Sequence, residues 1–345
     1  MKKAKQKSAS SIFSNRIYSV YKYALECNEM TKILVLFYSV LIKKGFYLKR
    51  WLKVLDVILE KGKGPVLEKL CTIQLIEADL QLLMIIYIGS RNNDKIESDE
   101  RLSQFNYGSR SNYSIEMAIL EKRLIYDIAV RDGKPMIHNI SDLKVYYDGQ
   151  LPNLGCLVQE AVEVNRNASK VFATVLPIMN HYICTDYGIS KSSYGSIIKK
   201  LGGTGQGNSV SGTICHDTSC LIFKYLEKKG LGAMLKHPIS RKIIQRIAIA
   251  FVDDTDFYAN RLNYEEKMQL IMDIYTKLYE AIGRKIQQTK IMFYCWKWIY
   301  ENGLQRIIQL DAKIIVHDEE IKSIDVNRST RTLGVHLTPS LKWKG

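Results

Sequence analysis

Residues 247–256 read Ile-Ala-Ile-Ala-Phe-Val-Asp-Asp-Thr-Asp, and this stretch decides the fold. The apolar, β-branched run predicts a buried strand that ends at the adjacent carboxylates Asp253 and Asp254, with residues 257–260 as the returning strand of a hairpin. Because successive side chains of a strand point to opposite faces, both acids can serve one site only at the turn. Charged acids at the end of a buried strand are costly unless a cation neutralises them. The stretch therefore indicates a site for a hard divalent cation such as Mg²⁺, with a solvated Asp-rich turn as the alternative.

The composition is that of a globular protein with a polyanionic partner. The chain has 345 residues, 46% hydrophobic and 25% charged, which is enough for two or three subdomains. Its 50 basic and 35 acidic residues give a net charge of +15, and nucleic acid is the commonest partner of such a surface. We expect no stable membrane association, because the sequence shows no basic amphipathic terminal helix. The longest apolar run, Ile33 to Ile42, is about ten residues long and too short to span a bilayer.

The cysteines favour an intracellular protein. All seven are scattered without a Cys-x-x-Cys pair. Cys215-His216 with Cys220 is the nearest approach to a metal cluster and lacks a second half, which favours free thiols over zinc. Reduced cysteines fit the nucleus or the cytoplasm. Because no acid precedes Glu26, a transit peptide for an organelle stays an alternative.

Periodicity predicts the elements around the acid pair. Residues 12–60 are expected to be helical, and the clearest helix runs to Ile282, with Asn263 and Glu266 as a capping box and Gly283 as its stop. The other expected elements are strands at 70–76, 136–142 and 291–294 and helices from Glu77, at 114–132, near 169–182 and from Ser211.

A further acid, Asp142, ends the strand expected at 136–142. If that strand neighbours the acid-pair hairpin, three carboxylates converge, and two divalent cations held by such acids activate a 3′-hydroxyl and stabilise a pyrophosphate leaving group. Lys290, at the start of an adjacent expected strand, is placed to neutralise or protonate the leaving phosphates, with a solvent-facing lysine as the alternative. The glycine-rich loop at 201–211 lets backbone approach a ligand closely, but it is not a P-loop.

The order of these features strongly resembles that of the reverse transcriptases of retroelements, especially those of non-LTR retrotransposons. The motifs that carry the resemblance, in the family's order, are Asp142–Asp148, Gln206–Ser211, Phe251–Asp254, Lys290 and Leu333–Val335. The palm resemblance covers about residues 135 to 345. Residues 51–79 and 107–110 resemble the fingers more weakly.

This resemblance implies an α+β right-hand polymerase fold. Its palm is an antiparallel sheet backed by helices, its fingers region is mostly helical, and its thumb is truncated. The implied domains are N-terminal helices and fingers at 1–134, a palm at 135–322 with a fingers-type insertion near 155–200, and a primer-grip segment with the start of the thumb at 323–345.

The resemblance also implies an RNA-directed DNA polymerase that adds dNTPs to a DNA primer on an RNA template, using two Mg²⁺ ions, or Mn²⁺. Asp142 and Asp253 would be the principal metal ligands, with Asp254 assisting. Tyr147 would be the steric gate that excludes a 2′-hydroxyl. The remaining implied contacts are Gln206 and Gly207 on the incoming nucleotide and template base pair, Lys290 near the leaving pyrophosphate, and Lys69 and Arg110 on the triphosphate or template.

Departures from the family pattern keep a second function open. Cys71 stands where such enzymes usually carry an arginine, and a neutral thiol makes no charge-assisted bond to phosphate. Tyr146 stands where a small residue is usual, and the chain stops at the start of the thumb. The alternative is therefore a catalytically decayed, nucleic-acid-binding remnant. An RNA-dependent RNA polymerase is disfavoured by Phe251-Val252 before the acids and by Tyr147. The sequence does not indicate the oligomeric state.

Overall fold

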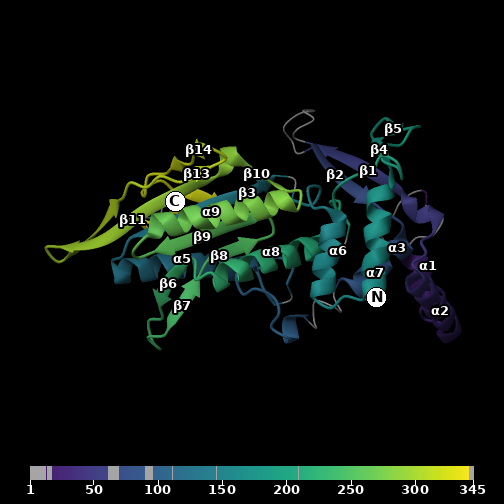
Figure 1. Ribbon diagram of the computed structural model, residues 1–345, viewed down its shortest axis with the longest axis horizontal. Helices are drawn as coiled ribbons and strands as arrows, with labels where there is room; N and C mark the ends of the chain where they lie inside the picture. Colours follow the sequence, from purple (N-terminus) through teal and green to yellow (C-terminus); the bar gives the residue numbers. More distant parts are fainter. Residues whose placement is uncertain are drawn as a thin grey trace. The chain divides into compact units, whose positions relative to one another are not determined.

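The computed structural model describes residues 13, 18–60, 70–89, 96–110, 112–144, 146–208 and 210–341 (Figure 1). Contacts divide the chain into two units that interleave in sequence. The first unit comprises residues 1–101 and 147–215, and the second comprises residues 102–146 and 216–345. The domain boundaries expected after residues 134 and 322 stay predictions.

The first unit combines helices with a small sheet. Its helices are α1 (Tyr18–Ala24), α2 (Asn28–Lys44), α3 (Ala78–Tyr87), α6 (Pro152–Ala161) and α7 (Arg166–Val175). Its strands are β1 (Lys53–Glu60), β2 (Leu70–Leu75), β4 (Asn180–Thr185) and β5 (Gly188–Ile189). The strand order is β2-β1-β4-β5, and β1 runs antiparallel to β2 and parallel to β4.

The prediction that residues 12–60 are helical is wrong at its C-terminal end. A 3₁₀ turn at Lys49–Leu52 leads into β1, which has a neighbour on each edge. Val54, Leu55 and Asp56 are buried in succession, so β1 is covered on both faces and lacks the alternation that identifies a half-exposed strand. The helix expected near 169–182 likewise ends at Val175, and β4 occupies its last residues.

The second unit is built on a larger, mainly antiparallel sheet. Its strand order is β12-β11-β3-β9-β8, with β10 paired to β3 and β15 paired to β11. These strands are β3 (Met136–Lys144), β8 (Ala248–Phe251), β9 (Asp254–Asn260), β10 (Lys285–Ile286), β11 (Met292–Glu301), β12 (Leu304–Gln309) and β15 (Lys322–Ser323). Two-stranded ribbons complete the unit: β6 (Ala233–Lys236) with β7 (Ile243–Arg246), β13 (Ile315–Val316) with β14 (Glu319–Glu320), and β16 (Thr330–Thr332) with β17 (Val335–Leu337).

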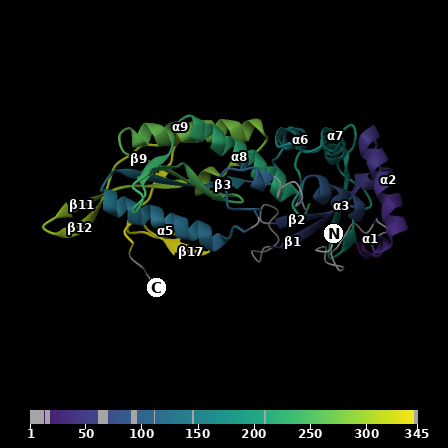
Figure 2. The same ribbon diagram turned by 90° about the horizontal axis from the view of Figure 1, so that it is seen from below.

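Helices cover both faces of the larger sheet. Figure 2 shows α9 (Tyr264–Ala281) on one side of it and α5 (Ile115–Asp132) on the other. On the α9 side, the ring of Phe257 lies 4.7 Å from that of Tyr275 and 6.2 Å from that of Phe223, which belongs to α8 (Ser211–Lys228). On the α5 side, Tyr126 packs edge-on against Trp296 at 5.5 Å. The expected α+β class and the expected antiparallel sheet backed by helices are confirmed.

The helix ends follow local capping chemistry. The side chain of Ser114 accepts a hydrogen bond from the Met117 amide at the start of α5, and Gly133 ends that helix in the left-handed conformation. The capping box expected for α9 is wrong. Asn263 has a φ of 57° and makes no side-chain cap bond, since its left-handed backbone differs from the extended geometry of a capping residue. Among the described residues, none of the helices is long and apolar enough to cross a bilayer.

Candidate active site

The hairpin of β8 and β9 places the acid pair at a tight turn. Phe251 is the cross-strand partner of Asp254, so Val252 and Asp253 form a two-residue loop. Val252 has a φ of 60°, which is rare for a β-branched residue but is what such hairpin turns require. A Cβ at Gly108 would lie 2.6 Å from the Val252 amide nitrogen. The neighbouring loop therefore holds the turn, and this close approach requires glycine at position 108.

Three carboxylates converge at this end of the sheet. Asp142 on β3 is the direct cross-strand partner of Asp254 on β9, so both side chains leave the sheet on the same face. Asp253 adjoins them in the turn. Burial, and then the charges of Asp253, Asp256 and Asp142, raise the pKa of Asp254 to about 6, although Lys122 acts in the opposite direction. The charges of the neighbouring acids thus add to the effect of burial on Asp254.

Lys290 reaches Asp142 from a 3₁₀ turn at Gln288–Lys290, one residue before β11. Its Nζ forms an ion pair with Asp142 Oδ2. The Gln287 amide donates to the Asp142 carbonyl oxygen at 3.0 Å and extends the ladder between β10 and β3. The Lys290 side chain is 55% exposed and that of Asp142 is 17% exposed, so this ion pair is open to solvent and to exchange.

The donor set fits a hard divalent cation by its chemistry. Asp142, Asp253 and Asp254 offer only oxygen ligands, and their mutual repulsion is the condition that a cation relieves. In the part of the chain that the structure describes, no three His, Cys, Asp or Glu side chains are arranged to hold a metal ion as they stand. Lys290 supplies the positive charge next to Asp142 in this arrangement.

A buried polar network lies next to these acids and was not found by sequence reasoning. Asp256, two residues after Asp254, forms an ion pair with Lys122 of α5, and both side chains are only 2% exposed. His138 Nε2 lies 3.6 Å from Asp256 Oδ1, and His138 Nδ1 is 2.7 Å from the Tyr126 hydroxyl. Burial alone raises the pKa of Asp256, but Lys122 and His138 overcome this effect and hold the pKa below its usual value. The i, i+2 spacing from Asp254 was the signal available in the sequence.

The glycine-rich loop belongs to the first unit, where it lies against β2. The Gln206 carbonyl oxygen accepts a hydrogen bond from the Gln74 amide at 2.7 Å. Cys71 Sγ donates to Gln206 Oε1 at 3.2 Å. Gly207 has a φ of 98°, and a Cβ there would lie 2.9 Å from the Gln74 carbonyl oxygen, so the position requires glycine. The Tyr147 carbonyl oxygen accepts the Thr204 amide at 3.0 Å, which ties the expected steric gate to this loop.

The remaining expected residues have different surroundings. Lys69 lies outside the described residues. Arg110 belongs to the second unit, donates to the carbonyl oxygens of Ser103 and Asn106, and places its guanidinium 3.7 Å from the centre of the Tyr113 ring. It therefore organises the loop beside the Val252 turn, and its contact with nucleotide or template stays a prediction. Tyr146 is buried in the second unit, 4.4 Å from the Arg284 guanidinium.

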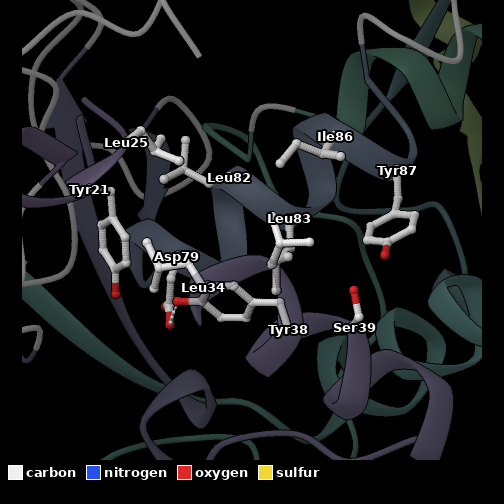
Figure 3. Close-up of a pocket in the computed structure, with 11 residues that line it drawn as sticks. Tyr21, Leu25, Leu34, Tyr38, Ser39, Asp79, Leu82, Leu83, Ile86 and Tyr87 are labelled. Atoms are coloured by element: carbon white, nitrogen blue, oxygen red, sulfur yellow. Dashed lines mark hydrogen bonds between the residues drawn. The ribbon is translucent and has the colours of Figure 1, made fainter. Parts of the chain in front are cut away.

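A hollow of about 280 Å³ among α1, α2 and α3 contains none of the expected site residues. Figure 3 shows the Tyr38 hydroxyl next to the Asp79 carboxylate in the lining of this hollow. Asp79 is buried and fully engaged: it accepts hydrogen bonds from Tyr38 at 3.0 Å and Trp51 at 2.9 Å and forms an ion pair with Arg50. Asp79 thus ties the N-terminal helices to the residues that precede β1.

Comparisons with known proteins do not identify a family for this chain. No protein-family model matches the chain, and no curated protein matches it. Solved telomerase from Candida albicans, in complex with the TWJ fragment of telomeric RNA, matches with a TM-score of 0.49 and 13% identity over 79% of this chain and 44% of that chain. Telomerase from Candida tropicalis with the same kind of fragment gives a TM-score of 0.47 and 11% identity over 72% and 42%. The chain spans less than half the length of either telomerase, and TM-scores below 0.5 lend no argument about its activity.

Proposed function

We propose that the chain is the RNA-directed DNA polymerase of a retroelement, of the non-LTR retrotransposon type. The observation that carries the proposal is the direct cross-strand pairing of Asp142 with Asp254, with Asp253 in the adjoining turn. Carboxylates fixed on neighbouring strands are suited to phosphoryl transfer, which needs little from a protein beyond positioning and charge. RNA template, DNA primer and dNTPs are the partners of this reaction, and the net charge of +15 suits them.

In this proposal Asp142 and Asp253 hold the divalent cations, Mg²⁺ or Mn²⁺, and Asp254 assists. When bound, two such ions activate the primer hydroxyl and stabilise the leaving pyrophosphate. Lys290, which pairs with Asp142 here, would neutralise the leaving phosphates once the cations occupied the acids. Tyr147 excludes the 2′-hydroxyl of a ribonucleotide, and Gln206 and Gly207 contact the incoming nucleotide and its template base.

Primer extension on a primed RNA template, with dNTPs and Mg²⁺, tests the proposal. Asp253→Asn should abolish extension and leave nucleic-acid affinity nearly unchanged, because it removes one charge from a turn. Asp318→Asn is the matched control, since Asp318 is an exposed acid in the turn between β13 and β14 of the same unit, and it should extend as the wild type does. Extension by Asp253→Asn, or an equal loss of binding and extension, would remove the catalytic assignment.

A catalytically decayed remnant that still binds nucleic acid is the second candidate. The observation in its favour is Cys71, whose thiol bonds the Gln206 side chain in the first unit. Where the family pattern has an arginine, the thiol provides no positive charge for a triphosphate. Extension by Cys71→Arg but not by the wild type would identify a decayed enzyme with an intact acid site. Extension by the wild type would exclude this candidate.

A further inference from the structure

Two lysines face each other at the end of β3. Lys285 of β10 is the direct cross-strand partner of Lys144, and Ile286 is the partner of Leu143. Leu143 and Ile286 are buried, so the alternation of side chains directs both lysines to the opposite face, where they are exposed. Like charges directly opposite one another destabilise a sheet. The arrangement therefore has an electrostatic cost that a bound anion would remove.

A third ammonium group, that of Lys290, lies beside the same stretch of sheet. Lys144 is two residues from Asp142 on β3, so the two side chains share a face, and Lys290 forms its ion pair with Asp142. Among the described residues, neither Lys144 nor Lys285 forms an ion pair with an acid. Positive charge thus gathers beside the acids, at the place where a polymerase would handle the phosphates of its nucleotide.

We propose that Lys144, Lys285 and Lys290 form a binding site for pyrophosphate, both as the β- and γ-phosphates of an incoming nucleotide and as the released product. This inference rests on the proposed polymerase function and adds two residues to it. Lysine serves as a mobile point charge for phosphate, and two lysines held at one cross-strand position suit a compact polyanion. The alternative is that the lysines only keep the short β10 edge from pairing with another strand, which requires no affinity for anions.

Isothermal titration of the full chain with inorganic pyrophosphate, without divalent cation, tests the site. The double variant Lys144→Ala with Lys285→Ala should bind at least about tenfold more weakly than the wild type, a loss of about 1.4 kcal/mol. Replacing both lysines by arginine should keep the affinity within about threefold, since the charge is retained. Lys297→Ala is the matched control, because Lys297 lies on the same sheet opposite Ile308 and should bind as the wild type does. An affinity that the double alanine variant leaves unchanged, or a wild type that does not bind pyrophosphate, would overturn the site.

Thermal unfolding provides an independent reading of the same charges. Lys285→Glu should raise the melting temperature in the absence of anion, because a like-charged cross-strand pair becomes an oppositely charged one. The same variant should lose the stabilisation that pyrophosphate gives to the wild type. If the variant melts below the wild type in the absence of anion, the two lysines do not repel each other, and no electrostatic cost remains for a bound anion to remove.

The outcomes separate this site from the polymerase proposal. Titration measures binding without turnover, so pyrophosphate binding that depends on these lysines would stand even if the chain never extends a primer. If the chain extends primers but the double alanine variant binds pyrophosphate as tightly as the wild type does, the lysine site is refuted and the polymerase proposal stands. If the double variant loses affinity for a primed RNA template and keeps its affinity for pyrophosphate, the lysines contact the nucleic-acid backbone, and the proposal is wrong.

Discussion

Removing Lys122 should destabilise the second unit strongly, because its ammonium group is the counter-charge of a buried carboxylate. Both Lys122 and Asp256 are 2% exposed, so water cannot replace the lost charge. Lys122→Met keeps the length and apolar character of the stem and removes only the ammonium group. Asp256 would then remain as a buried acid, with the imidazole of His138 as a remaining neighbour whose Nε2 lies 3.6 Å from Asp256 Oδ1.

Breaking a buried pair by removing one partner costs about 3–5 kcal/mol, and the nearby imidazole places the expected loss in the lower half of that range. This is a large share of the roughly 5–15 kcal/mol that stabilises a typical domain. The double variant Lys122→Met with Asp256→Asn should recover part of the loss, because no uncompensated charge stays in the core.

The pH dependence of stability should reverse between the two chains. In the wild type the pKa of Asp256 is lower in the folded than in the unfolded state, so its contribution is present above the unfolded pKa and is lost as the pH falls through the folded value. In Lys122→Met, burial is left as the main influence and raises that pKa, so stability should fall as the pH rises.

Urea unfolding at several pH values between 4 and 8 measures both effects. The gap between wild type and Lys122→Met should widen with rising pH. A loss below about 1 kcal/mol at pH 7, or a gap that does not change with pH, would refute the view that Lys122 neutralises Asp256 in the core.

Three further outcomes are expected. The pKa of Asp254 is raised to about 6, so the folded protein binds a proton at Asp254 more tightly than the unfolded chain does. The free energy of unfolding should therefore fall as the pH rises from about 4 through 6. Asp254→Asn should remove that part of the pH dependence, as measured by urea unfolding. Gly207→Ala should cost about 1–3 kcal/mol, since its φ of 98° and the close Gln74 carbonyl exclude a Cβ, and an unchanged melting temperature would contradict the described loop. Tyr147→Ala should admit ribonucleotides in primer extension, and unchanged sugar selectivity would remove the steric-gate assignment.

The sequence predicted the second unit better than the first for a physical reason. The hairpin at Phe251–Asp254 and the strand ending near Asp142 are bounded by acids and turns, and their pairing follows from those ends. Strand β1 gave no such signal, because it is covered on both faces and its apolar run reads as a helix. Its parallel pairing with β4 joins residues 53–57 to residues 180–184, and local patterns carry no information on so distant a partner.

The site could be predicted only where chemistry follows strand alternation. Asp142 lies two residues before the end of β3 and Asp254 begins β9, and both emerged because the sequence places them at the ends of expected strands, whereas Asp256 was hidden by its place inside β9. Lys122 is a charged residue on the apolar face of α5. In the sequence it only interrupts the helical pattern of apolar residues, and nothing there indicates that it pairs with the distant Asp256. Lys144 and Lys285 are cross-strand partners in a pairing of only two residues, and so short a strand cannot be predicted from the sequence pattern.

The lysines that pair with the acids differ in how easily a cation could displace them, and this difference indicates which acids a cation would bind. Lys122 is buried against Asp256, so that pair is a permanent part of the core. Lys290 is more than half exposed, and an ion pair of that kind is worth about 0–1 kcal/mol, so a cation can displace it from Asp142 at little cost. Asp254 has neither kind of partner among the described ion pairs, and burial, followed by the charges of its neighbouring acids, raises its pKa. In the proposed function, the divalent cation would therefore gain most between Asp254 and Asp142, where the two strands place their carboxylates opposite each other.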